Sequence, residues 1–427
     1  MTATALAAPA PEAHAVPLPP RALRIPILLA VVAAFTLIAF GFFGRDEVVR
    51  VVWSAAGDAV TLDPTPVVPR VVGIVSGIIA VAAAAYSLWR ANRREPGSVW
   101  LSVIVGVAFL VSIVTWVGAG GTVPVSFLLS GTIGLSTAIV FGALAGVIGE
   151  RVGIVNIAIE AQLLGGAFTA AFVASATGSQ LVALVAAMIV GALISMVLAA
   201  FAIVYLVDQV IVGVVLVGLV TAITNFLYAA VMGPNSQQFN DPGTLPRLPI
   251  PLLSDIPILG SVLFNQRLTT YLMFVLVPLV WFVLFKTRTG LRIRALGEHP
   301  LAADTVGIKV NPWRFWTVTA AGLIAGLGGA ALSIGSVGAF VREMSAGQGF
   351  IALACVILGR WHPLYASLAA LLFGFASTFR IWAGQAGAAI PSDLIQATPY
   401  VVTVLAVALV AGRVIGPKAA GKPYIKE

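Results

Sequence analysis

The chain has 427 residues, of which 60% are hydrophobic and 9% are charged, with a formal net charge of +8 and a mean hydropathy of +1.05. A soluble globular chain carries a charged fraction of about a quarter, so this composition excludes that class. Apolar runs long enough to cross a bilayer as helices recur along the sequence. The sequence therefore predicts an all-α fold, a polytopic transmembrane helical bundle.

Residues 1–20 are rich in alanine and proline and lack the basic start of a signal peptide. We interpret them as a disordered cytoplasmic tail. Arg21 and Arg24 then precede an apolar stretch that is too long for a cleaved signal sequence, so this stretch is expected to remain as a span. The basic residues form no long stripe interleaved with aromatic residues, and we therefore expect no nucleic-acid partner.

The predicted spans number ten to twelve. One candidate, near residues 346–359, is too short for an ordinary span and is followed at once by the sequence RWHP. It is expected to be a broken or re-entrant helix, which is tolerated at membrane depth where protein or a cavity surrounds it. The apolar segments fall near residues 23–43, 71–89, 99–119, 127–149, 154–175, 181–206, 209–232, 270–286, 315–338, 346–359, 363–381 and 396–413.

Basic residues collect in the cytoplasmic loops of membrane proteins. They cluster here at 90–94, at Arg151, at 286–314 and in the tail 416–427, which places both termini in the cytoplasm. The predicted organisation is the tail 1–20, an N-terminal transmembrane extension at 21–120, a transmembrane core at 121–415 with a cytoplasmic loop near 286–314, and the tail 416–427. The opposite side carries the long loop 233–267, which is either a docking surface for an external partner or a plain extracellular cap.

An enzyme active site is not expected. The three histidines, His14, His299 and His362, are scattered, and no His, Cys, Asp or Glu cluster has the spacing of metal ligands. The sequence GPKAAGKP at 416–423 has the G-x-x-x-x-G-K spacing of a phosphate-binding loop. However, proline follows the lysine where serine or threonine should hold Mg²⁺, so we interpret the match as coincidence and expect no cofactor on this chain.

Ionisable or strongly polar residues inside spans are costly and indicate function by default. Asn156 and Glu160 lie four residues apart in GERVGIVNIAIEAQLLGGAF and would share one face of a helix that lines a polar pathway. The alternative is that they bond across to neighbouring helices or neutralise an arginine. Asn225, deeper in another span, is a further pathway candidate. Asp208 is interpreted as the cap of its helix.

The basic loop at 290–314 contains a nearly uncharged core, HPLAADTVG. Pro300 suits the start of a short helix and Gly307 suits its end. The alternative for this loop is a solvated positive-inside segment. Its spacing resembles the E-A-A-x-x-x-G pattern of ABC importer permeases, in which a short coupling helix docks on an ATPase subunit. Leu301 replaces the glutamate of that pattern, and the resemblance assigns Gly297, Glu298, Ala302, Ala303 and Gly307 to the coupling loop.

Three segments in the order of the chain carry the wider resemblance. RTGLRIRALGEHPLAADTVGI, GERVGIVNIAIEAQLLGGAF and GQGFIALACVILGRWHPLYASLAALLFG are similar to signatures of the permeases that serve ribose, nucleoside and branched-chain amino-acid importers, closest to the nucleoside (guanosine) branch. His299 stands where that family has asparagine, and Ala161 where it has glycine. After DQVIVG, Val217 stands where the nucleoside branch often has asparagine, which favours a different ligand preference if that asparagine binds substrate.

This resemblance implies a permease subunit of an ATP-driven importer in a bacterial plasma membrane, most simply for nucleosides. It implies as partners an ATP-binding subunit, a second homologous permease and an extracytoplasmic substrate-binding lipoprotein. Simple sugars such as ribose and branched-chain amino acids are the alternative substrates. Two alternatives come from other classes: a secondary transporter driven by protons through Glu160, and a receptor or scaffold that moves no substrate.

Overall fold

The structure is a computed structural model that describes residues 23–55, 60–386 and 416–426. The chain divides into two compact units, of which unit 1 comprises residues 1–50 and 66–121 and unit 2 comprises residues 51–65 and 122–427. The predicted tail at 1–20 and the predicted span at 396–413 lie outside the described residues.

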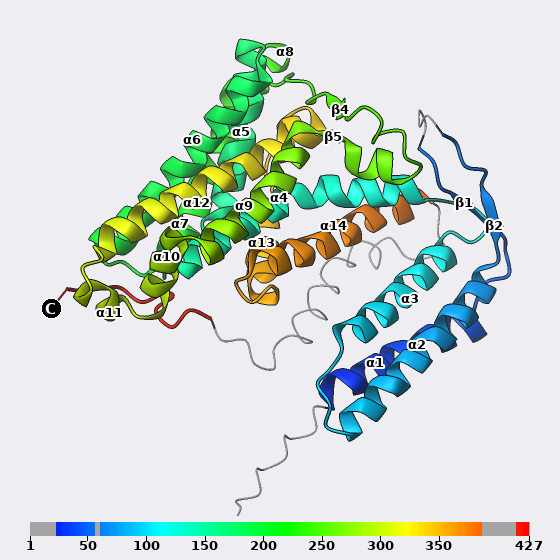
Figure 1. The fold of residues 1–427 in the computed structure, drawn as a ribbon. Helices are drawn as coiled ribbons and strands as arrows, with labels where there is room; N and C mark the ends of the chain where they lie inside the picture. Colours follow the sequence, from blue (N-terminus) through cyan, green and yellow to red (C-terminus); the bar gives the residue numbers. More distant parts are fainter. Residues whose placement is uncertain (1–22, 56–59, 387–415, 427) are drawn as a thin grey trace, which may run out of the picture. The chain divides into compact units, whose positions relative to one another are not determined.

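Unit 1 contains three apolar helical spans in its described part (Figure 1). They are α1 (Arg24–Phe35) with its π-helical continuation η1 (Thr36–Phe42), α2 (Pro69–Asn92) and α3 (Val99–Val117). Small residues such as Ala80 and Ala84 pack against Val105 in its core. The hydroxyl groups of Ser76 and Ser112 lie 2.6 Å apart and join α2 to α3. The short strands β1 (Val49–Val52), β2 (Thr65–Val67) and β3 (Thr122–Pro124) follow or precede these spans.

Unit 2 holds the remaining spans of the described chain. Long apolar stretches favour continuous helices in this unit. The span at 268–286 is helical although it contains Pro278. The helical elements are α4 (Val125–Arg151), α5 (Ile159–Thr177), α6 (Gln180–Ala199) with η2 (Ala200–Val204), α7 (Gln209–Leu227) with η3 (Tyr228–Met232), α8 (Ser236–Phe239), η4 (Gly260–Phe264), α9 (Leu268–Lys286), α10 (Arg288–Glu298), α11 (Pro300–Thr305), α12 (Val310–Leu332) with η5 (Ser333–Val337), α13 (Gln348–Leu358) and α14 (Pro363–Gln385).

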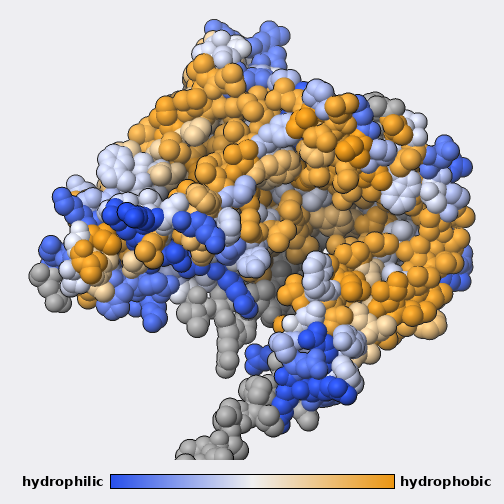
Figure 2. Space-filling view, viewed as in Figure 1, coloured by the Kyte–Doolittle hydropathy of each residue, from blue (hydrophilic) through white to orange (hydrophobic). Residues whose placement is uncertain are grey.

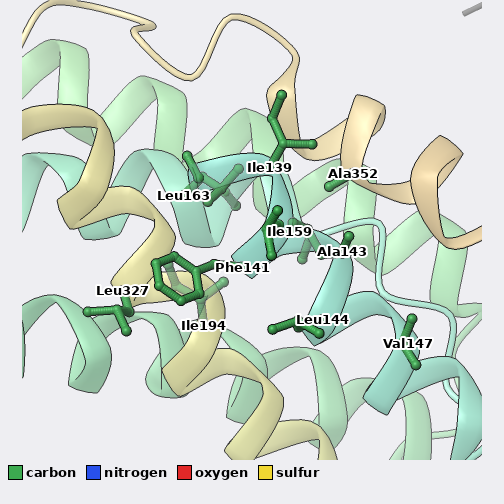
Figure 3. Close-up of a cluster of buried hydrophobic side chains, with 14 of the residues drawn as sticks. Ile139, Phe141, Ala143, Leu144, Val147, Ile159, Leu163, Ile194, Leu327 and Ala352 are labelled. Atoms are coloured by element: carbon green, nitrogen blue, oxygen red, sulfur yellow. The ribbon is translucent and has the colours of Figure 1, made fainter. Parts of the chain in front are cut away.

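The core of unit 2 lies where α4, α5, α6 and α12 pack against one another (Figures 1 and 3). Figure 3 shows Phe141 and Leu144 of α4 among Leu163 of α5 and Leu327 of α12, all of them buried. Glycines allow the closest approaches. A Cβ at Gly326 would collide with the backbone of α6, and one at Gly142 would lie 2.9 Å from Ala352 of α13. Small residues therefore let the helix backbones meet closely.

Apolar side chains also cover the outside of unit 2. Figure 2 shows hydrophobic residues over the sides of its helices and hydrophilic residues gathered at the end that carries α10 and α11. Ten described helices are long and apolar enough to cross a membrane, and α13 is a shorter apolar helix. This agrees with the predicted polytopic bundle and with the short segment expected at 346–359.

The segment before α13 is the irregular half of a broken span. Residues 339–347 are turns without helix, and Glu343 and Ala346 adopt positive φ angles of 56° and 44°. α13 then runs eleven residues to Leu358, and the chain turns at Arg360 and Trp361, both again with positive φ. Such backbone is stable at this depth only when other groups of the protein satisfy its polar atoms.

One predicted helix begins later than expected. The apolar pattern predicted helix from residue 154, but α5 begins at Ile159, and residues 152–158 form a non-helical turn. Asn156 and Glu160 therefore do not share a helical face, which corrects that prediction. The turn is fixed because Gly153 has a φ of +99°, and because the backbone N–H of Val155 donates to the side chain of Gln209 at 2.7 Å.

Helix starts follow the sequence elsewhere. Asp208 caps α7 as predicted, because its carboxylate accepts hydrogen bonds from the N–H groups of Val210 (2.8 Å) and Ile211 (3.1 Å). The loop at 233–267 is more ordered than a plain loop. It contains α8, η4 and an antiparallel hairpin of β4 (Arg247–Pro249) and β5 (Asn265–Arg267).

Candidate functional site

The short helix predicted in the basic loop is present as α11. It begins at Pro300, and His299 serves as its cap because Nδ1 accepts a hydrogen bond from the N–H of Ala302 at 3.4 Å. The helix ends at Thr305, and Gly307 follows with a φ of +85°, a conformation that favours glycine. His299 thus performs the capping role that an asparagine would perform at this position.

The five residues assigned to the coupling loop divide into two groups. Gly297 and Ala303 face inward and are buried, whereas Glu298, Ala302 and Gly307 are exposed. A Cβ at Gly297 would collide with the backbone at Arg151, while a Cβ at Gly307 would have no neighbour within 4 Å. Gly297 and Ala303 therefore pack against the bundle, whereas Glu298, Ala302 and Gly307 lie on the exposed side of the loop.

The open side of α11 is apolar. Leu301 is 48% exposed and Val306 is 74% exposed, although both lie outside the apolar spans. These two side chains give the outer side of α11 an apolar surface. Leu301 therefore offers an apolar contact where the pattern of related permeases has glutamate.

The C-terminal residues 416–426, here called the C-terminal strap, fasten this loop to the rest of unit 2. The strap contains the sequence GPKAAGKP and forms turns, so the resemblance to a phosphate-binding loop has no structural counterpart in the described residues. Tyr424 is buried. Three interactions join the strap to the rest of unit 2. The N–H of Ala419 donates to the carbonyl of Gly297 at 2.9 Å, the N–H of Gly421 donates to the carbonyl of Gly153 at 3.2 Å, and Lys426 forms an ion pair with Asp304 at 3.4 Å.

Arg314, on the first turns of α12, is the buried centre of this arrangement. It is 1% exposed, Nη1 donates to the carbonyl of Lys422 at 3.1 Å, and Nη2 donates to the carbonyl of Leu296 at 3.3 Å. A Cβ at Gly153 would lie 2.6 Å from Nη2, so only glycine fits beside the guanidinium. Sequence reasoning interpreted Arg314 as an orientation determinant and missed this role. No spacing in the sequence relates it to residues 296 and 422.

A second fastening joins α4 to the turn after α13. The Trp361 indole N–H donates to the carboxylate of Glu150, and the Arg151 Nε donates to the carbonyl of Trp361 at 3.0 Å. Sequence reasoning did not assign Glu150 a partner. Its position at the end of a long apolar run, next to arginine, was the only signal.

Glu160 holds the irregular segment before α13. Its carboxylate accepts hydrogen bonds from the Ser345 hydroxyl (2.7 Å) and from the N–H groups of Gly347 (2.8 Å) and Gly349 (2.6 Å). The side chain is buried, and a Cβ at Gly349 would collide with Glu160. The carboxylate therefore satisfies the backbone at the start of α13, where a negative charge also suits the helix dipole. This is the arrangement of the alternative in which Glu160 bonds across to a neighbouring element.

Asn156 belongs to a different network. It is fully buried, and its amide exchanges hydrogen bonds with the amide of Gln162 at 3.2 and 3.3 Å. Gln162 in turn donates to the Ser195 hydroxyl at 2.9 Å. The structure thus joins Asn156 to α5 and α6, and it does not bring Asn156 to the carboxylate of Glu160.

Asn225 of α7 lies against the same irregular segment that Glu160 holds. Its amide nitrogen donates to the carboxylate of Glu343 at 3.1 Å, and its Oδ1 is buried without a partner among the described residues. Gln348, the first residue of α13, likewise has a buried and unpartnered Oε1 in the described chain. Such acceptors are unfavourable unless a donor reaches them. Asn225 and Gln348 therefore present hydrogen-bond acceptors that no other described residue fills.

Aromatic rings pack against the irregular segment 339–347, which includes Phe340. The Phe340 ring packs edge-on against Phe168 with 5.2 Å between centroids and lies 6.0 Å from Tyr228. The guanidinium of Arg342 lies 5.1 Å from the centre of the Tyr228 ring. Among the described residues, no group of three or more His, Cys, Asp or Glu side chains could hold a metal ion.

A polytopic helical bundle with a basic end, an exposed short helix at that end and a broken span next to polar groups that lack a partner among the described residues is typical of a membrane transport protein. Residues 128–411 match the family described as branched-chain amino acid transport system / permease component. The chain belongs to this family, so it is the membrane-spanning component of a transport system and not an enzyme.

Curated relatives include two bacterial permeases. The nucleoside ABC transporter permease protein NupC of Lactococcus lactis is 46% identical over 180 residues, which cover 42% of this chain and 57% of that protein. The guanosine ABC transporter permease protein NupQ of Bacillus subtilis is 39% identical over 310 residues, covering 70% of this chain and 97% of that protein.

The glucose ABC transporter permease protein TsgB13 of Haloferax volcanii is 30% identical over 148 residues, covering 33% of this chain and 36% of that protein. No solved structure matches the chain. The family match begins at residue 128, so it does not extend to the spans of unit 1.

Proposed function

We propose that this chain is the permease subunit of an ATP-driven importer for nucleosides in a bacterial plasma membrane. The observation that carries the substrate is the likeness to a guanosine permease over 97% of that protein's length. ATP hydrolysis belongs to a separate subunit, and this chain binds no cofactor of its own. Simple sugars and branched-chain amino acids are the alternatives within the family, and transport driven by protons through Glu160 is no longer favoured.

The groups along the broken span suit a nucleoside. Its base offers an aromatic face that stacks on protein rings, and its ribose hydroxyls are hydrogen-bond donors. Phe340 and Tyr228 supply rings. Asn225 and Gln348 supply buried acceptors that lack a partner in the described chain. We therefore assign the substrate pathway to the α7 side of residues 339–348, with Asn225 in contact with substrate and Asn156 and Glu160 behind it as supporting residues.

The end with α10 and α11 faces the cytoplasm in this proposal. It carries the basic residues of the loop at 286–314 and of the C-terminal strap, as the positive-inside preference requires. Both termini then lie in the cytoplasm. The ATP-binding subunit docks on the exposed side of α11, a second homologous permease completes the channel, and an extracytoplasmic lipoprotein delivers the nucleoside.

Force from the ATP-binding subunit passes inward by contacts that exist in this chain. α11 is tied to the strap by Lys426, and the strap is tied to the turn before α5 by the bond between Gly421 and Gly153. That turn leads into Glu160, which holds the start of α13. Movement of α11 therefore tilts the broken span and exposes the pathway to one side of the membrane at a time.

Uptake measurements test the substrate. In cells that express the whole importer, radiolabelled guanosine is expected to enter in an ATP-dependent manner, and unlabelled nucleosides are expected to compete with it more strongly than ribose or leucine. Competition by ribose or leucine alone would overturn the nucleoside proposal and leave the family assignment unaffected.

Asn225→Ala is expected to lower nucleoside uptake about tenfold, because it removes a hydrogen bond whose loss costs about 1–2 kcal/mol in a buried site. Asn235→Ala is the matched control, since Asn235 is exposed and outside the broken span. Equal uptake by the two variants at equal expression would argue against a substrate contact at Asn225.

Gly307 tests the docking of α11. Gly307→Val is expected to abolish ATP-driven uptake for two reasons. A β-branched residue at a φ of +85° strains the turn by about 1–2 kcal/mol, and its side chain projects into the open space in which the ATP-binding subunit would dock. Gly307→Asn separates the two effects, since asparagine tolerates this conformation. Co-purification of the ATP-binding subunit is the measurement, and full retention with both variants would contradict docking at this turn.

A further inference from the structure

A pair of arginines lies on the side of unit 2 that carries the β4–β5 hairpin, away from α10 and α11 (Figure 1). Arg247 of β4 stands directly opposite Arg267 of β5 in the antiparallel register. Like charges in directly opposed positions destabilise a hairpin. Within the described residues neither arginine forms a salt bridge with a carboxylate. The hairpin therefore places two positive charges together without a negative charge between them.

Both arginines line one cavity of about 230 Å³. Gln266, Ser130, Thr270 and Ser336 contribute polar groups to its wall, and in the described part of the chain no acidic residue lines it. Arg267 is held in place because Nη1 donates to the carbonyls of Gly335 and Ser336, the latter at 3.1 Å. Burial and the charge of Arg247 lower the pKa of Arg267. The cavity is therefore a positively charged site, and an anionic group bound in it would offset the repulsion between Arg247 and Arg267.

Large apolar side chains surround the same hairpin outside the spans. Leu248 is 43% exposed, Leu252 is 84% exposed and Leu253 is 40% exposed. Apolar residues and arginine exposed together are typical of protein interfaces. A small free anion would not contact the exposed leucines, and an uncharged nucleoside would not neutralise the two guanidinium groups.

We propose that this surface, made by Arg247, Arg267 and the exposed leucines of residues 248–253, docks a soluble extracytoplasmic protein through an acidic side chain that enters the cavity. The inference rests on the proposed function, in which the partner on this side is the substrate-binding lipoprotein. The carboxylate of that partner neutralises the arginine pair, and apolar residues around it cover the leucines. The long loop at 233–267 is thus a docking surface and not a plain cap.

The test uses the whole importer in lipid nanodiscs and its purified binding protein. Arg247→Glu is the informative variant, because this side chain is exposed and its replacement leaves the main-chain bonds of Arg267 in place. Binding is expected to weaken about tenfold or more, chiefly through the association rate. Raising the salt concentration from about 0.05 M to about 0.5 M is expected to weaken wild-type binding and to leave the variant largely unchanged.

Two controls make the result specific. Arg380→Glu makes the same charge change at an exposed arginine that does not line the cavity, and its binding is expected to equal that of the wild type. Among aspartate or glutamate to lysine variants of the binding protein, at least one is expected to restore binding to Arg247→Glu and to bind the wild-type importer poorly.

The failures are distinguishable. Wild-type affinity in Arg247→Glu, with an unchanged salt dependence, overturns the docking surface and leaves the proposed function intact. Inorganic phosphate that binds to the wild type but not to the variant, without effect on docking, also overturns it and assigns the cavity to a small anion. A wild-type importer that binds no extracytoplasmic protein removes both the docking surface and the importer proposal.

Discussion

Replacing Glu160 by alanine is expected to release the start of α13 and to abolish transport. The carboxylate accepts three hydrogen bonds, of which two come from the backbone N–H groups of Gly347 and Gly349. Bonds to a charged acceptor contribute about 1.5–3 kcal/mol each, and a buried N–H left unpaired is itself destabilising. We therefore expect the free energy of unfolding to fall by at least about 3 kcal/mol, measured in detergent or nanodiscs.

Glu160→Gln refines this prediction. The amide oxygen can still accept hydrogen bonds, but the NH₂ group faces a backbone donor, so intermediate stability and partial uptake are expected. Asp208→Asn is the matched control, because asparagine caps a helix as well as aspartate does, and both properties should be unchanged there. Loss of uptake by Glu160→Gln at unchanged stability would contradict a supporting role and would revive a direct role in substrate or proton passage.

The spans were predictable because bilayer thickness imposes a length on every apolar run. The run at 209–232 and the run at 99–119 were each predicted within two residues of the helix that forms. The short segment at 346–359 was also identified, since α13 cannot reach across a membrane with eleven residues. Hydropathy carries this information locally, and no tertiary contact is needed to extract it.

The turn before α5 was not predictable in the same way. Residues 152–158 are as apolar as a helix, and only Gly153 hints at a break. What fixes the turn is distant in the sequence: Gln209 accepts from Val155, and Gly421 donates to Gly153. A pattern of apolar residues cannot report such bonds, so Asn156 and Glu160 were assigned to one helical face that does not exist.

The candidate site shows the same limit. Glu160, Asn156 and Asn225 were all selected because a polar residue inside a span is costly, and all three prove to have polar partners. Their partners could not be assigned from sequence, because Ser345 lies 185 residues from Glu160 and Glu343 lies 118 residues from Asn225. Sequence therefore indicated which side chains need partners, and only the fold says whether the chain itself supplies them.

Arg314→Met is expected to uncouple ATP hydrolysis from nucleoside uptake. The guanidinium joins the carbonyls of Leu296 and Lys422, and removing it takes the donor from the buried carbonyl of Leu296, at a cost of about 1–3 kcal/mol. The carbonyl of Lys422, an exposed residue, loses its bond to the bundle as well. The strap then loses its central anchor, so α11 can move without moving the turn at Gly153. Uptake is expected to fall at least about tenfold, while ATP hydrolysis continues, because the docking side of α11 is unchanged.

Proteolysis separates this mechanism from a general loss of folding. In inside-out vesicles, trypsin is expected to cleave after Lys418 faster in Arg314→Met than in the wild type, because the strap opens while the spans stay intact. Arg292→Met is the control, since Arg292 is exposed and lies 5.6 Å from the Trp313 ring without bonding the strap. Unchanged cleavage together with lost uptake would contradict the strap as the link. Cleavage only from the opposite side of the membrane would contradict the cytoplasmic assignment of α10, α11 and the C-terminus together.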